Sequence, residues 1–208
     1  AIVNVHANNK WYNIELKTDE SLNELMLVNK FYALTKDYTP KNLTNIGLDY
    51  SYGTEGENKL IDYAYEAFQE LWDAAYKKGY YLMVTSSYRD YASQEEIYNY
   101  RKSTQGERKA DETAARPGHS EHQTGLVIDM TSKSEPDAES FTESKAYAWL
   151  KENAYKYGYI ERYPEGKTYL TGYSPESWHW RYVGREAAKV MHDEDITYDE
   201  YYAYYIEK

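Results

Sequence analysis

The most regular pattern of hydrophobic and polar residues runs from Glu57 to Lys78. Apolar side chains recur there every three or four residues, which is the spacing of one buried helix face. Gly79 follows at a position where a glycine commonly ends a helix. We therefore predict a helix over Glu57–Lys78.

Shorter patterns predict the other regular elements. Apolar runs indicate four strands: Tyr80–Thr85, Gly125–Thr131, Tyr159–Tyr163 and Trp178–Val183. Helical spacing indicates further helices, the last of them short and tyrosine-rich: Ser93–Lys102, Thr142–Tyr157, Arg185–His192 and Tyr198–Tyr205. Ser93 and Glu96 have the spacing of a capping box.

The remaining segments are polar or irregular. Residues 103–115 are polar and predict a mobile loop. Residues 1–55 mix short apolar stretches with turn residues, and we expect a loop-rich extension that lies across the core. No repeat and no Pro- or Ser-rich linker interrupts residues 56–208. The pattern therefore predicts one α+β domain, 56–208, with an N-terminal extension, 1–55.

Composition narrows the chemistry. The chain has 208 residues, no cysteine, five histidines and a surplus of tyrosine, with 27 residues. The lack of cysteine excludes disulfides, Cys-ligated zinc, iron–sulfur clusters and a thiol nucleophile. A metal site must therefore use His, Asp and Glu side chains. No apolar run is long enough for a transmembrane helix.

Charge argues against one class of partner. Acidic side chains outnumber basic ones by 35 to 24, which gives a formal net charge of -11. Such a surface repels phosphate backbones, so we expect no nucleic-acid partner. The first residue is Ala rather than Met, which is consistent with a cleaved or trimmed preceding segment.

Two segments, 116–129 and 176–184, concentrate the residues that can do chemistry. They contain His122, Asp129 and His179, a set of two nitrogen ligands and one oxygen ligand that leaves a fourth position open, as catalytic zinc sites do. Zinc lowers the pKa of a water ligand to about 7, and Glu176 is placed to accept its proton. Structural roles are the alternative, since a single histidine is more often a packing or surface residue. An arginine or a helix N-terminus would also serve as the partner of Asp129.

The spacing of Glu176 needs an explanation. It precedes His179 by three residues, so on one regular strand the two side chains would face opposite sides. Because Pro175 comes directly before it, we expect Glu176 in the turn that leads into the strand.

Three blocks carry a resemblance to a known family. Residues 120–129 resemble the Ser-x-His-x-x-Gly-x-Ala-x-Asp motif of the zinc D-alanyl-D-alanine carboxypeptidases of the VanY type. Residues 176–184 resemble their Glu-Pro-Trp-His-x-Arg-Tyr-Val-Gly motif, and residues 85–94 their Ser-x-Tyr-Arg-x-Tyr-x-x-Gln stretch. The blocks stand in the family's order, and the likeness extends over roughly Leu25 to Val190.

The resemblance implies a fold and a site. The implied fold is α+β, with a small, mostly antiparallel sheet flanked by helices and a zinc site at the sheet, as in D-Ala-D-Ala metallopeptidases and hedgehog-like proteins. The resemblance implies that one zinc ion is held by His122, Asp129 and His179. It implies that Glu176 is the catalytic base. It also implies that the substrate's terminal carboxylate is received by Arg89, with Ser87 and Gln94. A guanidinium fork suits a carboxylate in a way that a lysine does not.

Other residues near the motifs carry weaker expectations. Val127 and Ser177 replace the family's Ala and Pro, with consequences for fine specificity at most. His119 is expected to be an exposed loop residue, although a contact near the site is an alternative. Arg181 is expected to share the strand face of His179, either pairing with a carboxylate near the site or bracing the sheet. For Trp178 and Trp180 we expect core packing.

Together these features predict a zinc carboxypeptidase that removes the C-terminal D-alanine from peptidoglycan stem peptides, with D,D- and L,D-specificity both open. The alternatives are a cell-wall endopeptidase of the phage-lysin kind and a non-catalytic wall-binding module whose tyrosines form the binding face. The expected partner is a stem peptide ending in D-alanine. We expect a monomer located outside the cell, wall-bound or membrane-anchored through a segment absent from this chain.

Overall fold

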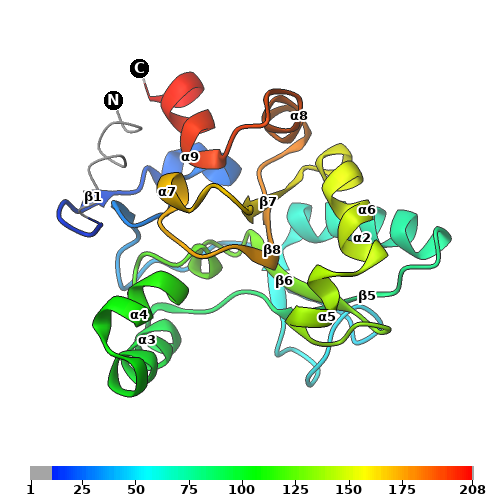
Figure 1. The fold of residues 1–208 in the computed structure, drawn as a ribbon, viewed down its shortest axis with the longest axis horizontal. Helices are drawn as coiled ribbons and strands as arrows, with labels where there is room; N and C mark the ends of the chain where they lie inside the picture. Colours follow the sequence, from blue (N-terminus) through cyan, green and yellow to red (C-terminus); the bar gives the residue numbers. More distant parts are fainter. Residues whose placement is uncertain (1–10, 208) are drawn as a thin grey trace.

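A four-stranded antiparallel sheet forms the centre of the computed structural model, which describes residues 11–207 (Figure 1). Its strands, in spatial order, are β5 (Leu82–Ser86), β6 (Val127–Ser132), β8 (Glu176–Tyr182) and β7 (Tyr159–Tyr163). Two smaller pairs flank it: β1 (Leu16–Lys17) with β2 (Tyr32–Ala33), which is parallel, and β3 (Leu43–Asn45) with β4 (Lys59–Ile61), which is antiparallel. The first ten residues of the predicted extension, His6 among them, lie outside the described residues.

Helices surround the sheet and form most of the remaining structure. The α-helices are α2 (Asp62–Lys77), α3 (Tyr91–Gln105), α4 (Glu107–Thr113), α5 (Ala138–Thr142), α6 (Lys145–Asn153), α7 (Thr168–Thr171), α8 (Arg185–Glu194) and α9 (Tyr198–Tyr201). Short helical turns are η1 (Glu20–Leu25), η2 (Glu121–Thr124), η3 (Ala154–Tyr157) and η4 (Tyr202–Ile206). The predicted α+β class with a mostly antiparallel sheet is confirmed. No helix within residues 11–207 is long and apolar enough to cross a membrane.

One face of the central sheet carries the main hydrophobic core. Phe68 and Leu71 of α2 pack there with Ile128 of β6 and Trp180 of β8, and all four side chains are buried. Because side chains alternate along a strand, Asp129 and its neighbours of the same parity point to the opposite face. The core therefore fixes which face of the sheet can carry polar chemistry.

The helix predicted over Glu57–Lys78 begins five residues later, at Asp62. Residues 59–61 instead pair with β3, in the register Leu43 to Ile61. The apolar spacing continued into this strand because Leu60 is fully buried in the same core. The C-terminal end is as predicted, with Gly79 at a φ of +89°.

The mobile loop predicted over 103–115 is wrong. α3 continues to Gln105, and α4 follows after Gly106, whose φ is +83°. The two helices form a hairpin, seen in green at the lower left of Figure 1. Only Ala110 of α4 is buried, so the segment lacks the apolar stripe by which helices are recognised.

The predicted capping box at Ser93 and Glu96 is also wrong. The N-cap of α3 is Asp90, whose side chain accepts a hydrogen bond from Ser93 N–H at 2.8 Å.

The remaining elements follow the predictions with local changes. The helix predicted over Thr142–Tyr157 is divided into the end of α5, then α6 and η3, before Gly158 at a φ of +84°. β7 coincides with the predicted strand, and the C-terminal tail is helical as predicted.

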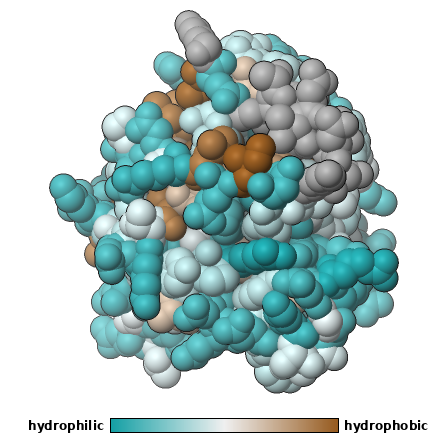
Figure 2. All heavy atoms as spheres, turned by 90° about the vertical axis from the view of Figure 1, so that its left-hand side faces the viewer, coloured by the Kyte–Doolittle hydropathy of each residue, from teal (hydrophilic) through white to brown (hydrophobic). Residues whose placement is uncertain are grey.

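The extension packs closely on the rest of the chain. Leu27 and Phe31 share a buried cluster with Val183, Ala188 and Tyr198 from the C-terminal third. The division of the chain at residue 55 stays a prediction. Figure 2 shows that the side with the extension and the α3–α4 hairpin is largely hydrophilic, which agrees with the many charged residues.

Candidate metal centre

Three potential ligands meet on the polar face of the sheet. Asp129 of β6 and His179 of β8 are cross-strand partners, so the register alone brings them side by side. His179 Nδ1 lies 3.3 Å from Asp129 Oδ1, and His122 Nε2, from η2, lies 3.3 Å from Asp129 Oδ2. One donor atom from each residue lies within 4.8 Å of the others.

Hydrogen bonds orient both imidazoles. His122 Nδ1 donates to the carbonyl oxygen of Ser87 at 2.6 Å, which leaves Nε2 free of a proton for a metal. His179 Nε2 lies 3.2 Å from Glu121 Oε1, which leaves Nδ1 toward the site. The two histidines therefore present different nitrogens to the site, Nε2 of His122 and Nδ1 of His179. In each ring, the partner of the second nitrogen fixes this choice.

The donor set fits zinc. Asp129 Oδ1 is buried and accepts no hydrogen bond from the residues that the structure describes. A tetrahedral site with ligand distances of about 2.0 Å separates its donors by about 3.3 Å, which matches both measured nitrogen–oxygen distances. Burial alone would raise the pKa of Asp129, but the adjacent His122 imidazole holds it well below its ordinary value. A buried carboxylate kept ionised beside two oriented imidazoles is suited to a divalent cation.

Glu176 is placed at the edge of this set. Its Oε2 lies 3.5 Å from His179 Nδ1, and burial raises its pKa to about 7. A group with a pKa near neutrality can accept and return a proton efficiently. The expected turn position is wrong, because Glu176 is the first residue of β8. The pairing of β7 with β8 is irregular at this point, because two residues of β7 lie opposite four residues of β8. This bulge puts the side chains of Glu176 and His179 on the same side of the strand.

Arg89 faces the same cleft from the segment before α3. Its Nη1 donates to Gln94 Oε1 at 2.8 Å and its Nη2 to Ser86 Oγ at 2.9 Å. Its backbone N–H donates to the carbonyl oxygen of His122 at 3.1 Å, which ties it to the metal ligands. Ser87 is not brought to the cleft, because its hydroxyl is engaged by Asn58 and by Lys59 N–H. Ser86 takes the place beside Arg89 that was expected of Ser87.

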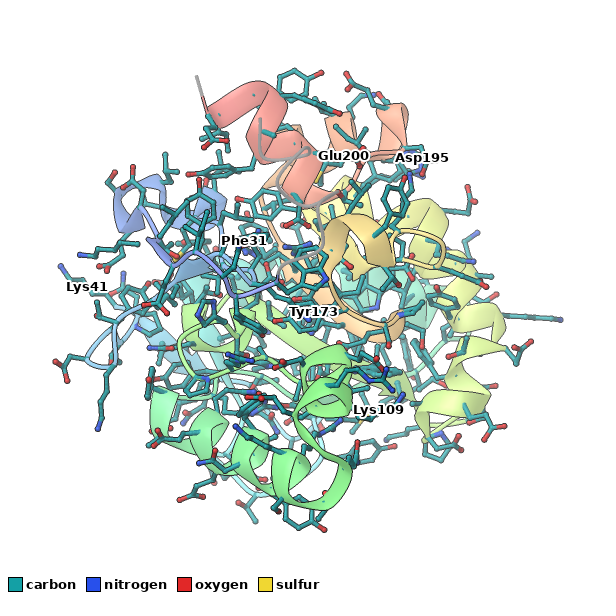
Figure 3. The ribbon with its side chains drawn as sticks, turned by 60° about the vertical axis from the view of Figure 1, so that its left-hand side comes forward. Phe31, Lys41, Lys109, Tyr173, Asp195 and Glu200 are labelled. Carbon is teal, nitrogen blue, oxygen red and sulfur yellow. The ribbon has the colours of Figure 1, made fainter. Side chains whose placement is uncertain are left out.

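The cleft around these residues has a volume of about 900 Å³. The three potential metal ligands form its floor, α3 and α4 form one wall, and Tyr163, Tyr173 and Trp178 line the other. Tyr173 lies between α7 and α4, where Ser174 N–H donates to the carbonyl oxygen of Glu112 (Figure 3). Trp178 was expected in the core but lines the cleft, whereas Trp180 is in the core as predicted.

Lys30 supports that wall from the extension. Its Nζ donates to the carbonyl oxygen of Asp111 in α4 and lies 4.4 Å from the centre of the Tyr173 ring. Burial lowers its pKa to about 8. The extension therefore contributes directly to the position of one cleft wall.

Glu121 contacts a candidate ligand, and sequence reasoning missed it. Its Oε1 contacts His179, while its Oε2 accepts from Arg162 at 3.0 Å and from Arg181 at 2.6 Å. Asp199 accepts from the far side of Arg162 at 2.6 Å. All four charged side chains are buried, and the two arginines hold the pKa of Glu121 well below its ordinary value against the effect of burial. The only sequence signal was its place inside the first motif, next to a ligand.

Two further expectations are settled by these contacts. Arg181 shares the face of His179 as predicted and pairs with Glu121, a carboxylate next to the site. His119 is buried rather than exposed, and its Nδ1 donates to the carbonyl oxygen of Asn29 in the extension at 2.7 Å. It lies outside the cleft lining.

The sequence matches the family model described as VanY, D-alanyl-D-alanine carboxypeptidase, over residues 57–185. The chain belongs to this family. YodJ of Bacillus subtilis (strain 168), whose name describes a carboxypeptidase, is 44% identical over 183 residues, covering 86% of this chain and 67% of YodJ. A D-alanyl-D-alanine carboxypeptidase of Enterococcus faecalis is 40% identical over 142 residues, covering 64% of this chain and 52% of that protein. The chain therefore spans about half to two thirds of these relatives.

Solved structures give the same result. The L,D-carboxypeptidase LdcB, described with the basis of peptidoglycan recognition, has a TM-score of 0.86 and 42% identity, covering 91% of this chain and 90% of LdcB. VanYB in complex with D-alanine-D-alanine has a TM-score of 0.74 and 33% identity, covering 89% and 99% of the two chains. A VanY variant is solved in complex with Zn(II), with a TM-score of 0.73 and 33% identity, covering 86% and 98%. The predicted family, fold and enzyme class are confirmed.

Proposed function

We propose that this chain is a zinc-dependent carboxypeptidase that removes the C-terminal D-alanine from peptidoglycan stem peptides. The observation that carries the proposal is one cleft holding both a ligand set fit for zinc and a half-buried guanidinium, that of Arg89. A metallopeptidase needs the first feature, and recognition of a free C-terminus needs the second.

The chemistry divides between the metal and the side chains. Zinc, when bound by His122, Asp129 and His179, supplies a lowered water pKa and polarisation of the scissile carbonyl group. Glu176 accepts the proton that water loses as it attacks that carbonyl carbon. It then gives the proton to the amine nitrogen of the departing D-alanine as the peptide C–N bond breaks. The products are D-alanine and a shortened peptide with a new carboxylate.

Arg89 orients the substrate in this proposal. Two of its N–H groups are held by Gln94 and Ser86, which fixes the plane of the guanidinium. The remaining donors can bind a terminal carboxylate with both oxygens. Holding the end of the peptide determines which bond lies over the metal, so the enzyme cuts one residue at a time.

The bond that is cut follows from which stem peptide fits. The greater likeness to LdcB than to VanYB, in both identity and TM-score, favours L,D-specificity, with a tetrapeptide as substrate. We further propose that the protein works as a monomer outside the cell, where peptidoglycan is located.

Mass spectrometry of tetrapeptide and pentapeptide muropeptides incubated with the zinc-loaded protein tests the proposal. We expect loss of one D-alanine from the tetrapeptide, its abolition by chelation, and its recovery on adding zinc. Glu176→Gln should retain zinc and lose nearly all turnover. Metal-free protein that still released D-alanine would refute the mechanism. Full activity of Arg89→Ala would indicate an endopeptidase instead.

A further inference from the structure

A second arginine lines the cleft, further from the metal ligands. Arg101 lies on α3 together with Gln94 and Ile97, and residues at these spacings share one helix face. All three line the cleft. Gln94 holds Arg89, and Arg101 follows Gln94 by seven residues, which is about 10 Å along a helix. One wall of the cleft therefore carries two guanidinium groups, at different distances from its catalytic end.

Arg101 has no acidic partner within residues 11–207. Its Nη1 donates one long hydrogen bond, 3.4 Å, to the carbonyl oxygen of Thr113 in α4, and it takes part in no ion pair there. Glu96 also lines the cleft but is exposed and forms no ion pair with Arg101 in the described part of the chain. Arg101 lines the same cleft as Glu176 and Arg89, so a substrate held in that cleft passes beside it.

The cleft is much larger than the terminal alanine of the substrate requires. Its volume of about 900 Å³ lies near the upper end of the range of about 300–1,000 Å³ for pockets that hold drug-sized ligands. One alanine fills a small part of that space. The residues that precede it in the peptide must therefore lie between α3 and the aromatic wall, where Arg101 is located.

Resting on the function proposed above, we propose that Arg101 binds a second carboxylate of the substrate, on a residue that precedes the terminal alanine. A guanidinium without an acidic partner, facing a substrate cleft, is matched by an anionic group that can accept two parallel hydrogen bonds. Stem peptides carry such a group in two places. One is the α-carboxylate of the γ-linked glutamate, and the other is the side-chain carboxylate of a third-position diaminopimelate. Amidation of the first or lysine in place of the second removes it, so Arg101 selects among stem peptides by charge.

Four synthetic tetrapeptides test this inference. They combine a free or amidated γ-linked glutamate with diaminopimelate or lysine, and kcat/KM is measured for D-alanine release. We expect the wild-type protein to prefer peptides with one of these carboxylates by about tenfold, the value of one charge-assisted contact. Whichever substitution in the peptide abolishes the preference identifies the carboxylate.

The variants separate a binding role from a bracing role. Arg101→Gln should reduce the ratio of kcat/KM values between the preferred and the other peptides to nearly one. Arg101→Lys should retain part of the preference. Arg108→Gln removes an exposed arginine from α4 and should keep the full preference. If Arg101 only braced α4 through Thr113, Arg101→Gln would slow all four peptides equally and the preference would remain. That result, or a wild-type protein that treats the four peptides alike, would overturn the inference.

A binding measurement keeps this test independent of turnover. Calorimetry with the Glu176→Gln protein gives the affinity of each uncleaved peptide, and the Glu176→Gln/Arg101→Gln protein gives the comparison. Absence of D-alanine release from all four tetrapeptides by the wild-type protein would refute the L,D-specificity proposed above, and absence of release from pentapeptides as well would refute the proposed function. The affinities would still decide the role of Arg101, because a preference of about tenfold that depends on Arg101 supports it and an equal affinity for all four peptides contradicts it.

Discussion

Two groups of buried charges meet at Glu121, and they are satisfied in different ways. In the ion cluster of Glu121, Arg162, Arg181 and Asp199, two positive and two negative side chains pair with one another at 2.6–3.0 Å. In the metal centre, one carboxylate faces two imidazoles, and Asp129 Oδ1 accepts no hydrogen bond from residues 11–207. The first group is complete without a ligand, and the second is completed by a cation.

This difference indicates what each group does for the protein. Because its charges are fully paired, the ion cluster is a structural unit. Removing one of its members would leave a buried charge uncompensated. The metal centre keeps its carboxylate ionised beside two imidazoles, and a cation would complete the set. Glu121 joins the two, because the same carboxylate orients a metal ligand and anchors two arginines.

The largest expected effect comes from Asp129→Asn. This variant should lose zinc and all measurable turnover, because one of three ligands is replaced by a weak one. Without metal, its unfolding free energy should fall below that of the metal-free parent, because the adjacent imidazoles stabilise the ionised carboxylate in the folded state. Zinc content and urea unfolding check this. An unfolding free energy equal to or above that of the metal-free parent would contradict the stabilisation of this carboxylate by the two imidazoles.

The same substitution in the ion cluster should have a larger effect on stability. Asp199→Asn leaves the buried guanidinium of Arg162 with one acidic partner instead of two. We expect the unfolding free energy to fall by about 3–5 kcal/mol, as measured by urea unfolding in the presence of zinc. An unchanged midpoint would contradict the description of this cluster as a structural unit.

Glu121→Gln tests the junction. The amide is a poorer acceptor for His179 Nε2, so zinc affinity should fall about 10–100-fold in a competition titration with a chelator. Glu70→Gln is the matched control, because Glu70 pairs with Arg185 on the surface. Equal zinc affinities for the two variants would show that Glu121 does not position the ligand.

The smallest effect concerns Lys30, a buried charge that forms no ion pair with a carboxylate in the described part of the chain. Burial lowers its pKa from 10.5 to about 8 in the folded state, so the unfolded chain binds more protons between these values. Stability should therefore rise by about 1–2 kcal/mol from pH 8 to pH 9.5 and fall again as pH is lowered. Lys30→Met should remove this rise, whereas Lys41→Met, at an exposed position, should keep it. Urea unfolding at the two pH values measures both.

How far the sequence could predict the site depends on the residue type. The candidate ligands His122, Asp129 and His179 were identifiable because the chain has few histidines and because the motifs are specific. Glu121 was not identifiable, because a glutamate in a polar loop is expected to be exposed to solvent unless its partner is known. Its partner Arg162 lies 41 residues away in the sequence. Its pairing exists only because β7 and β8 are neighbours in the sheet.

The fold was predicted best where the signal was local. β7 and the end of α2 followed from apolar runs and a terminal glycine. The α3–α4 hairpin was missed because its order comes from contacts between polar side chains, such as Asp111 with Tyr98 and Arg116. These contacts join positions that no hydrophobic period connects.

The close packing of the extension restricts how this enzyme can be shortened. Arg181 donates to the carbonyl oxygens of Glu24 and Met26, and His119 donates to that of Asn29. A fragment that starts at residue 56 would leave these buried donors without acceptors and would uncover the C-terminal cluster. The minimal catalytic unit must therefore include residues 24–34, and attempts to crystallise or engineer the enzyme should truncate elsewhere.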